Sequence, residues 1–495
     1  MKLTKGNLAG IKGPVKIPRQ ELFNLPEKIL QFGTGVLLRG LCDYFVHDAN
    51  TKGIFNGRIV VVKSTGSGTT DAFSEQDNLY TICVRGLDNG KIIEEDIICT
   101  AISRVLSAKQ EWNEILQTVH NPELQVIISN TTEVGLQLVK EKVLDTVPAS
   151  FPGKLLAVLY ERYRHLRNEG LVVIPTELLS DNGEILRGII NELIAFNNLD
   201  EEFKKWLDEK VVFCNSLVDR IVTKDPGEEL LTGIQNQLGY HDELLTMCED
   251  YRLWAIEGNA EVEKILSFAS TGEGAFVKPD IDIFKFLKLH LLNGTHTLSA
   301  SLAFLSGFEF VKQGMDDKLF SSYVENLMLN DIAKAIPYDI PGSEIKSFSS
   351  KVLDRFRNPF LEHKWINITL QNSMKMKNRN VPVLKKYNEL YGASPGYMAT
   401  GFAGYLLFMK PAKQEGNQFY GKRGNDFYPI NDEQAAYFSQ VWSNSGSVGK
   451  LVNNVLSNSA LWGTDLSRFT PFAESVEKKL SSMIDNGVLY TIKNI

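Results

Sequence analysis

The sequence lacks the features that mark several classes of protein. Its five cysteines are scattered and never form a CxxC pair, and its seven histidines show no HExxH or comparable spacing. We therefore expect free thiols, no disulfide framework and no metal site. Because no run of about 18 or more apolar residues occurs, we also predict that no segment spans a membrane.

The start of the chain and its net charge exclude further classes. The first residues, MKLTKGNLAGIKGPVKIPRQ, contain no apolar core of signal-peptide type, which together with the unpaired cysteines predicts a cytoplasmic protein. A net charge of −7 argues against a general nucleic-acid binder. It leaves room for a small anionic substrate, which needs only a local basic pocket. We expect a small-molecule substrate and a monomer or small homo-oligomer.

The length and composition are those of a multidomain globular protein. With 495 residues, 43% of them hydrophobic and 23% charged, the chain is too long for one ordinary core. The strand signals end near residue 276, and helical patterns follow. We predict an α/β protein with a Rossmann-type, doubly wound N-terminal domain over residues 1–276. An all-α substrate or catalytic domain would then occupy residues 277–495.

A glycine-containing turn follows the first predicted strand. Residues 29–32 are largely apolar, Gly33-Thr34-Gly35 comes next, and 36–47 has the pattern of a helix. A second strand at 58–63 gives βαβ spacing, which favours a dinucleotide site at Phe32, Gly33, Thr34 and Gly35. The third glycine of GxGxxG is absent because Leu38 stands there, so the motif alone is weak.

The end of the second strand leaves the choice of dinucleotide open. NAD-binding folds usually carry an acidic residue there, but this strand ends Lys63-Ser64-Thr65-Gly66. Either hydroxyls such as that of Ser64 and amides hold the ribose, or Lys63 favours the 2′-phosphate of NADP. A third strand at 124–129 leads into polar residues that include Thr132 and Glu133, at a position where ligands sit in open α/β sheets.

Two more buried strands complete the predicted sheet, and acidic residues follow each. The strand at 171–175 is followed by Glu177, and that at 211–213 is followed a few residues later by Asp219. Asp219 has two readings of about equal weight, a group that positions a lysine or a substrate hydroxyl and a structural salt bridge with Arg220. A cluster of turn residues at 414–417 and 421–425 predicts an exposed loop. Helical patterns or caps occur at 284–308, 321–334, 343–357, 362–376, 383–392, 397–410, 431–443, 447–457 and 471–486.

The first helix of the second half carries three polar residues beside an apolar face. At about 100° per residue, Asn293 lies roughly 140° and His296 roughly 80° round from Lys288, so all three fit within one sector. An amine, an amide and an imidazole that converge can hold the oxygen of an alcohol or a ketone. Taken alone, a solvated helix face is the more frequent explanation of such residues.

Several motifs in order resemble one family. Lys288-x4-Asn293-x2-His296 is similar to the KxxxxNxxH signature of the mannitol dehydrogenase family of polyol-specific long-chain dehydrogenases. The resemblance covers roughly residues 28–410. Further landmarks that agree are Gly33-Thr34-Gly35-x3-Arg39-Gly40, Gln76-Asp77-x-Leu79-Tyr80-Thr81, Thr132-Glu133-x-Gly135, Asn215-x2-Val218-Asp219-Arg220 and Arg355-Phe356-x-Asn358-Pro359.

The resemblance implies reversible hydride transfer between NAD(H) and a secondary alcohol without a metal. Lys288 would be the general acid and base, Asn293 would donate to the developing alkoxide, and His296 would orient the same oxygen or a neighbouring hydroxyl. Because an ordinary lysine pKa is about 10.4, we expect desolvation and nearby cations to lower that of Lys288.

Within the family, the residues are closer to a branch that acts on keto-uronates. Glu177 and Leu178 stand where other members have a Cys-Asp-Asn type sequence, and Asn367 stands where they have arginine. Lys375 is the predicted partner of the substrate carboxylate. Arg355 and Arg379 are weaker candidates that read more simply as surface cations. Glu177, Asp219 and His363, the last on a predicted amphipathic helix, complete the expected substrate contacts.

Two alternatives stay open at this point. Another keto-uronate or a hexitol could be the substrate within the same chemistry, although Asn367 and Leu178 argue against this. A protein that senses NAD(H) without catalysis belongs to a different class. The complete Lys288, Asn293 and His296 set argues against a sensor, which has no need of a proton donor.

Overall fold

The computed structural model of the chain describes residues 1–63, 71–131, 135–223, 227–272 and 274–495. The chain forms two compact units. The N-terminal unit comprises Met1–Gly86 and Ile92–Ile281, and the C-terminal unit comprises Leu87–Lys91 and Asp282–Ile495. Within the described parts of the chain, every helix is too short or too polar to cross a lipid bilayer.

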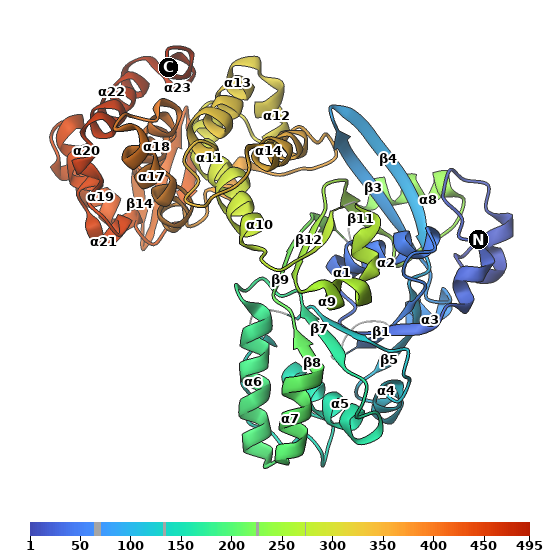
Figure 1. The fold of residues 1–495 in the computed structure, drawn as a ribbon. Helices are drawn as coiled ribbons and strands as arrows, with labels where there is room; N and C mark the ends of the chain where they lie inside the picture. Colours follow the sequence, from blue (N-terminus) through green and yellow to red (C-terminus); the bar gives the residue numbers. More distant parts are fainter. Residues whose placement is uncertain (64–70, 132–134, 224–226, 273) are drawn as a thin grey trace. The chain divides into compact units, whose positions relative to one another are not determined.

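A six-stranded parallel sheet forms the centre of the N-terminal unit (Figure 1). In the order β5-β2-β1-β6-β7-β8, strands β2 and β5 are added on one side of β1, and strands β6, β7 and β8 are then added on its other side. This reversal places a topological switch point between β1 and β6, and it confirms the predicted doubly wound fold. The strands are β1 (Glu27–Phe32), β2 (Arg58–Lys63), β5 (Ile102–Ser107), β6 (Val126–Ser129), β7 (Leu171–Pro175) and β8 (Val211–Phe213).

Alternate residues of these strands enter two separate cores. Ile29 and Val61 belong to a core that includes Phe45 and Trp254, whereas Leu30 and Val60 belong to one that includes helix residues such as Leu155. Burial on both faces explains why the strands are nearly continuous runs of β-branched and apolar residues. The helices on the second face are α4 (Trp112–Thr118), α5 (Phe151–His165), α6 (Asn182–Asn197) and α7 (Glu201–Lys210), which are grouped together in Figure 1.

Smaller sheets complete the N-terminal unit. A four-stranded sheet has the order β10-β11-β3-β4, and a three-stranded sheet has the order β13-β12-β9. Their strands are β3 (Tyr80–Asp88), β4 (Lys91–Cys99), β9 (Ser216–Asp219), β10 (Val222–Thr223), β11 (Thr246–Glu249), β12 (Leu253–Glu257) and β13 (Ala275–Lys278). The remaining α-helices are α1 (Val36–Gly40), α2 (Cys42–Thr51), α3 (Asp71–Glu75), α8 (Glu228–Leu238) and α9 (Ala260–Ile265). All five cysteines are buried free thiols.

The helix predicted after the first strand is not continuous. It breaks at Leu41, whose backbone angles of φ −129° and ψ −72° are not helical, and so forms α1 and α2. The chain is closely packed beside this break, because a Cβ atom on Gly40 would lie 2.7 Å from the Val222 side chain of β10.

The C-terminal unit is mostly helical, as predicted, but it is not all-α. Its helices include three π-helices, η5 (Leu287–Gly294), η6 (Leu327–Ile332) and η7 (Met376–Asn380). The first α-helices are α10 (Asp282–Phe286), α11 (Thr295–Leu305), α12 (Val311–Asp316), α13 (Lys318–Asn326), α14 (Gly342–Phe356), α15 (Trp365–Ile368) and α16 (Asn372–Lys375). The later ones are α17 (Val381–Tyr391), α18 (Gly396–Phe408), α19 (Ala435–Asn444), α20 (Val448–Leu456), α21 (Ser459–Trp462), α22 (Thr470–Asn486) and α23 (Val488–Lys493).

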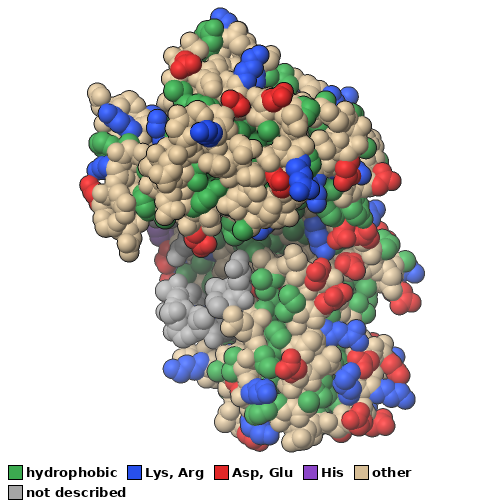
Figure 2. Space-filling model, turned by 90° about the vertical axis from the view of Figure 1, so that its left-hand side faces the viewer, with side chains coloured by type: hydrophobic (Ala, Val, Ile, Leu, Met, Phe, Trp, Pro, Cys, Tyr) green, Lys and Arg blue, Asp and Glu red, His purple; other side chains and the backbone are tan. Residues whose placement is uncertain are grey.

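The segment predicted as an exposed loop is an antiparallel three-stranded sheet. It consists of β14 (Lys413–Glu415), β15 (Gln418–Arg423) and β16 (Asp426–Ile430). Of the turn residues that suggested a loop, 416–417 and 424–425 connect the strands, and Gly416 and Gly424 adopt φ of +58° and +60° there. On the face of the molecule seen in Figure 2, acidic and basic side chains are interspersed.

Candidate active site

Lys288 and Asn293 lie on the π-helix η5, and His296 lies in the first turn of α11. The prediction of one α-helix over 284–308 was therefore wrong in its first half, at residues 287–294. In a π-helix the backbone hydrogen bonds join residues five apart, so residues i and i+5 lie above one another. Lys288 and Asn293 are five apart and share a face, where a regular α-helix would separate them by roughly 140°. The wide turns thus bring the amine and the amide closer in direction than α-helical spacing predicts.

Gly294 holds η5 close to a second π-helix, η7. A Cβ atom on Gly294 would lie 2.9 Å from Oδ1 of Asn380, the last residue of η7. The imidazole of His290 in η5 also bonds to the carbonyl oxygen of Arg379, with 2.6 Å between Nδ1 and the oxygen. This close packing explains why a glycine occupies a helical position where it is otherwise unfavourable.

Aromatic rings fix the imidazole of His296. Its ring stacks on that of Phe356, with 3.9 Å between centroids and 10° between planes. The edges of His363 and Trp365 complete the enclosure, at centroid distances of 5.3 and 6.0 Å. The buried Nε2 atom of His296 makes no hydrogen bond to any described residue. Since buried polar groups are normally paired, a ligand oxygen is the kind of group that would satisfy this nitrogen.

Burial and nearby positive side chains keep the His296 imidazole neutral. Desolvation lowers its pKa well below the ordinary histidine value, and His363, Arg355, Arg379 and Lys375 lower it further by charge repulsion. A neutral imidazole offers one donor and one acceptor. It can therefore orient a hydroxyl group without adding another charge to the site.

The cations of this cluster are partly removed from water. Burial, followed by repulsion from Arg379, lowers the pKa of Lys375 to about 8, and burial lowers that of Arg379 to about 10. Nζ of Lys375 donates to the carbonyl of Ile368 at 2.9 Å, and Nη1 of Arg379 donates to Oγ1 of Thr297 at 3.1 Å. Arg379 and Arg355 are both half-buried and are not the surface cations that the sequence suggested. Partly desolvated cations are an environment that suits a carboxylate.

His363 belongs to this cluster, but it lies outside the helix that was predicted for it. It does not lie on a helix, because its carbonyl accepts from the amide of Val311 at 2.8 Å and its neighbour Lys364 forms a β-bridge with Phe310. Burial, with repulsion from Arg355 and Lys375, lowers the pKa of His363. The predicted helix over 362–376 is in fact two short helices, α15 and α16, separated by Gln371 at φ +50°.

The glycine-containing turn after β1 has the backbone that a dinucleotide requires. Gly33 adopts φ +128°, and a Cβ atom there would lie 3.0 Å from the carbonyl oxygen of Asn130, the residue after β6. Among the described residues, leaving out Gly35 and its two chain neighbours, no atom lies within 4 Å of the position that a Cβ atom on Gly35 would take. Phe32 ends β1, and Thr34 lies between the two glycines. A pyrophosphate can approach such a turn closely, so these residues fit a nicotinamide cofactor. Ser64, Thr132 and Glu133 lie outside the described residues.

Glu177 and Asp219 belong to the N-terminal unit, where Glu177 follows β7 and Asp219 is the last residue of β9. The buried carboxylate of Glu177 accepts from the Thr131 amide at 2.8 Å, from its hydroxyl at 3.0 Å and from the Ser129 hydroxyl at 3.2 Å. Burial raises the pKa of Glu177. The side chain thereby holds the segment that follows β6. Asp219 ends β9 and is half-buried, and the guanidinium of its neighbour Arg220 donates to the carbonyls of Glu249 and Gly40.

Sequence reasoning missed the aromatic side chains of the site. Phe356 and Trp365 enclose His296, yet aromatic residues in helical segments usually belong to a core, and nothing in their spacing marks these two. The only available signal for Phe356 is its position next to Arg355 in the matched Arg-Phe-x-Asn-Pro motif.

Comparisons with known proteins agree with this architecture. Residues 27–268 match the model of the mannitol dehydrogenase Rossmann domain, and residues 280–484 match that of the mannitol dehydrogenase C-terminal domain. The chain belongs to the mannitol dehydrogenase family and is therefore an oxidoreductase that acts on CH–OH groups. This result confirms the family that the sequence motifs indicated.

Two similar proteins are altronate oxidoreductases. The chain is 34% identical to the altronate oxidoreductase of Halalkalibacterium halodurans, over 96% of this chain and 94% of that protein. It is 33% identical to that of Bacillus subtilis over 94% of each chain.

Solved structures share the fold. The Pseudomonas fluorescens mannitol 2-dehydrogenase ternary complex with NAD and D-mannitol has a TM-score of 0.67 at 23% identity, covering 100% of this chain and 99% of that one. A D-sorbitol dehydrogenase in substrate-free form has a TM-score of 0.80 at 19% identity, covering 99% and 100%.

Proposed function

We propose that this chain catalyses the NAD-dependent, metal-independent reduction of D-tagaturonate to D-altronate, a reversible step in hexuronate breakdown. One observation supports a uronate substrate over a neutral hexitol. In the C-terminal unit, the pKa of the His296 imidazole is lowered by charge repulsion from three half-buried cations, Lys375, Arg379 and Arg355. A keto-uronate brings a carboxylate that balances this charge, and a neutral hexitol does not. The similarity to altronate oxidoreductases supports tagaturonate among the keto-uronates.

The proposed chemistry divides between the cofactor and the residues of this chain. When bound at Phe32, Gly33, Thr34 and Gly35, NAD(H) supplies or takes up the hydride. Lys288, as the ammonium, donates a proton to the carbonyl oxygen during reduction, and as the free amine it removes that proton during oxidation. The amide of Asn293 donates to the oxygen as negative charge develops on it.

The remaining residues orient the substrate. The neutral imidazole of His296 bonds to the reacting oxygen or to the neighbouring hydroxyl, and its contact with Phe356 keeps the ring in one orientation. Lys375 pairs with the carboxylate, with Arg379 and His363 beside it. Glu177 holds the segment after β6, and Asp219 positions Lys288 or a substrate hydroxyl.

Absorbance of the reduced nicotinamide tests the proposal. Purified protein is mixed with NADH or NADPH and with tagaturonate, fructuronate or fructose in parallel, with and without a chelator. We expect fast oxidation of NADH with tagaturonate, unchanged by the chelator. A preference for fructuronate or fructose would agree with the chemistry of the family but reject tagaturonate as the substrate. A preference for NADPH would reject NAD as the cofactor.

A lysine variant separates catalysis from cofactor sensing. Lys288→Ala should retain cofactor binding while its turnover falls by about 100-fold or more, since a positioned acid contributes 10²- to 10⁴-fold. Lys351→Ala, an exposed lysine on α14, is the matched control and should keep full turnover. Unchanged turnover of Lys288→Ala would reject the mechanism, and cofactor binding without turnover of any substrate by the native chain would support a sensor.

A further inference from the structure

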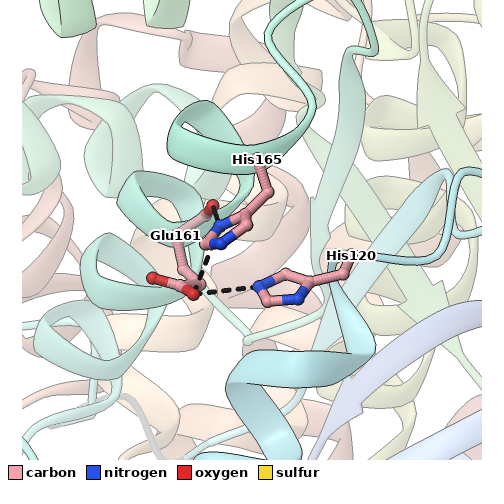
Figure 3. Close-up of side chains that lie close together, drawn as sticks. All are labelled: His120, Glu161 and His165. Atoms are coloured by element: carbon pink, nitrogen blue, oxygen red, sulfur yellow. Dashed lines mark hydrogen bonds and ion pairs between the residues drawn. The ribbon is translucent and has the colours of Figure 1, made fainter.

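Three side chains outside the candidate active site point their polar atoms at one another (Figure 3). They are His120, from the segment after α4, and Glu161 and His165, from the last turns of α5. One ligand atom from each lies within 4.8 Å of the other two. All three belong to the N-terminal unit.

The two imidazole nitrogens converge on a single carboxylate oxygen. Nε2 of His120 lies 2.9 Å and Nδ1 of His165 lies 3.3 Å from Oε1 of Glu161. The two imidazole rings are stacked, with 3.8 Å between centroids and 26° between planes, so their nitrogen edges face the same side. A tetrahedral zinc ion with bonds of about 2.0 Å holds neighbouring ligand atoms about 3.3 Å apart. The measured separations are therefore close to the edges of a zinc coordination sphere.

We propose that His120, Glu161 and His165 bind a zinc ion or a similar divalent transition-metal ion. Two imidazoles and a carboxylate form a ligand set that zinc accepts, and Glu161 and His165 are four apart, which places them on one helix face. The absence of a metal-ligand motif in the sequence does not count against this site, because His120 reaches it only through the fold.

The surroundings indicate what such an ion would do. The three side chains are 35%, 19% and 43% exposed, so water can occupy the fourth position and the ion can exchange with solvent. The metal would displace the contact between Nδ1 of His165 and the backbone carbonyl oxygen of Glu161, which are 3.1 Å apart. The guanidinium of Arg164 lies 4.0 Å from Oε2, the second carboxylate oxygen of Glu161. Because His120 precedes β6 and the other ligands are on α5, the ion would fasten this helix to the entry of a central strand.

Zinc titration of the full chain, freed of metal by a chelator and without a histidine tag, tests the site. We expect one zinc ion per chain, a higher melting temperature with zinc, and visible Co²⁺ absorption typical of tetrahedral coordination. His120→Ala and His165→Ala should each weaken binding by more than about 100-fold, since losing even an outer-shell partner costs 10- to 100-fold. His241→Ala, an exposed histidine of the same unit, is the control and should bind zinc normally.

Two results would overturn the proposal. One is equal zinc binding by the native chain and by a His120→Ala/His165→Ala double variant. The other, which does not depend on any variant folding, is the lack of an anomalous scattering peak among the three side chains in crystals soaked with zinc. The test is independent of the proposed activity, because NADH oxidation should proceed with or without the metal.

Discussion

The imidazole of His296 lies flat on the ring of Phe356, with 3.9 Å between ring centroids. Stacking fixes the ring plane, and with it the direction of the unpaired Nε2 atom. Phe356→Leu keeps an apolar side chain but removes the flat surface. We expect kcat to fall by about 10- to 100-fold, because small misplacements of a reacting group have effects of this size. Phe472→Leu, an equally buried ring in α22, should lower the melting temperature without this loss.

A pH profile should reveal the titration of Lys375. Its pKa is lowered to about 8, so the ammonium loses its proton as pH rises through that value. If it pairs with the substrate carboxylate, kcat/KM for reduction should fall as pH rises above about 8, since kcat/KM reports the free enzyme. Lys375→Arg stays charged over this range and should lose the inflection. An inflection near 8 that persists in Lys375→Arg would assign it to another group.

Gly294 provides a test of the packing between the two π-helices. Alanine is normally favoured over glycine within a helix by about 1 kcal/mol. At Gly294, however, the added Cβ atom would press on Asn380 and displace η7, which carries Arg379. Gly294→Ala should therefore lower kcat/KM and gain no stability. Gly188→Ala, in the exposed middle of α6, should raise stability and leave kcat/KM unchanged, because no described residue beyond its own turn of helix lies within 4 Å of the new Cβ.

Glu177 should influence cofactor binding through the segment that it holds. Glu177→Gln keeps one acceptor oxygen but turns an NH2 group toward the donors of Thr131 and Ser129. An unsatisfied buried group costs about 1–3 kcal/mol, so KM for the cofactor should rise about tenfold while kcat changes little. Measured dissociation constants for NADH would check this. Glu184→Gln, exposed at the start of α6, should match the native chain, and equal affinity for both variants would contradict the assigned role.

The sequence was most informative where local pattern determines structure. The strands β1 and β6 were predicted from short apolar runs that end in polar or glycine residues, because burial on both faces leaves that pattern in any parallel sheet. The break at Leu41 could not be predicted in this way, and it lies beside a close approach of Val222 from a distant strand that no local pattern encodes.

In the candidate site too, the sequence predicted the local features but not those that depend on tertiary contacts. The spacing of Lys288, Asn293 and His296 is visible in the sequence, but residues 284–305 carry an ordinary α-helical pattern with no sign of a π-helix. The wide turns accompany packing of Gly294 against Asn380, a tertiary contact that helix propensity does not encode. The wrong prediction of a helix at His363 also results from a tertiary contact. The β-bridge beside it joins Lys364 to Phe310, which lies about 50 residues earlier in the chain.

The π-helix η5 makes the number of residues in this segment as important as their identity. Removing one residue between Lys288 and Asn293 would rotate everything that follows by the turn of one π-helical residue relative to the lysine. Replacing a residue in that interval would leave the angle unchanged. The number of residues from Lys288 to His296 therefore sets the relative direction of these side chains. It should stay constant among functional relatives even where the intervening residues differ.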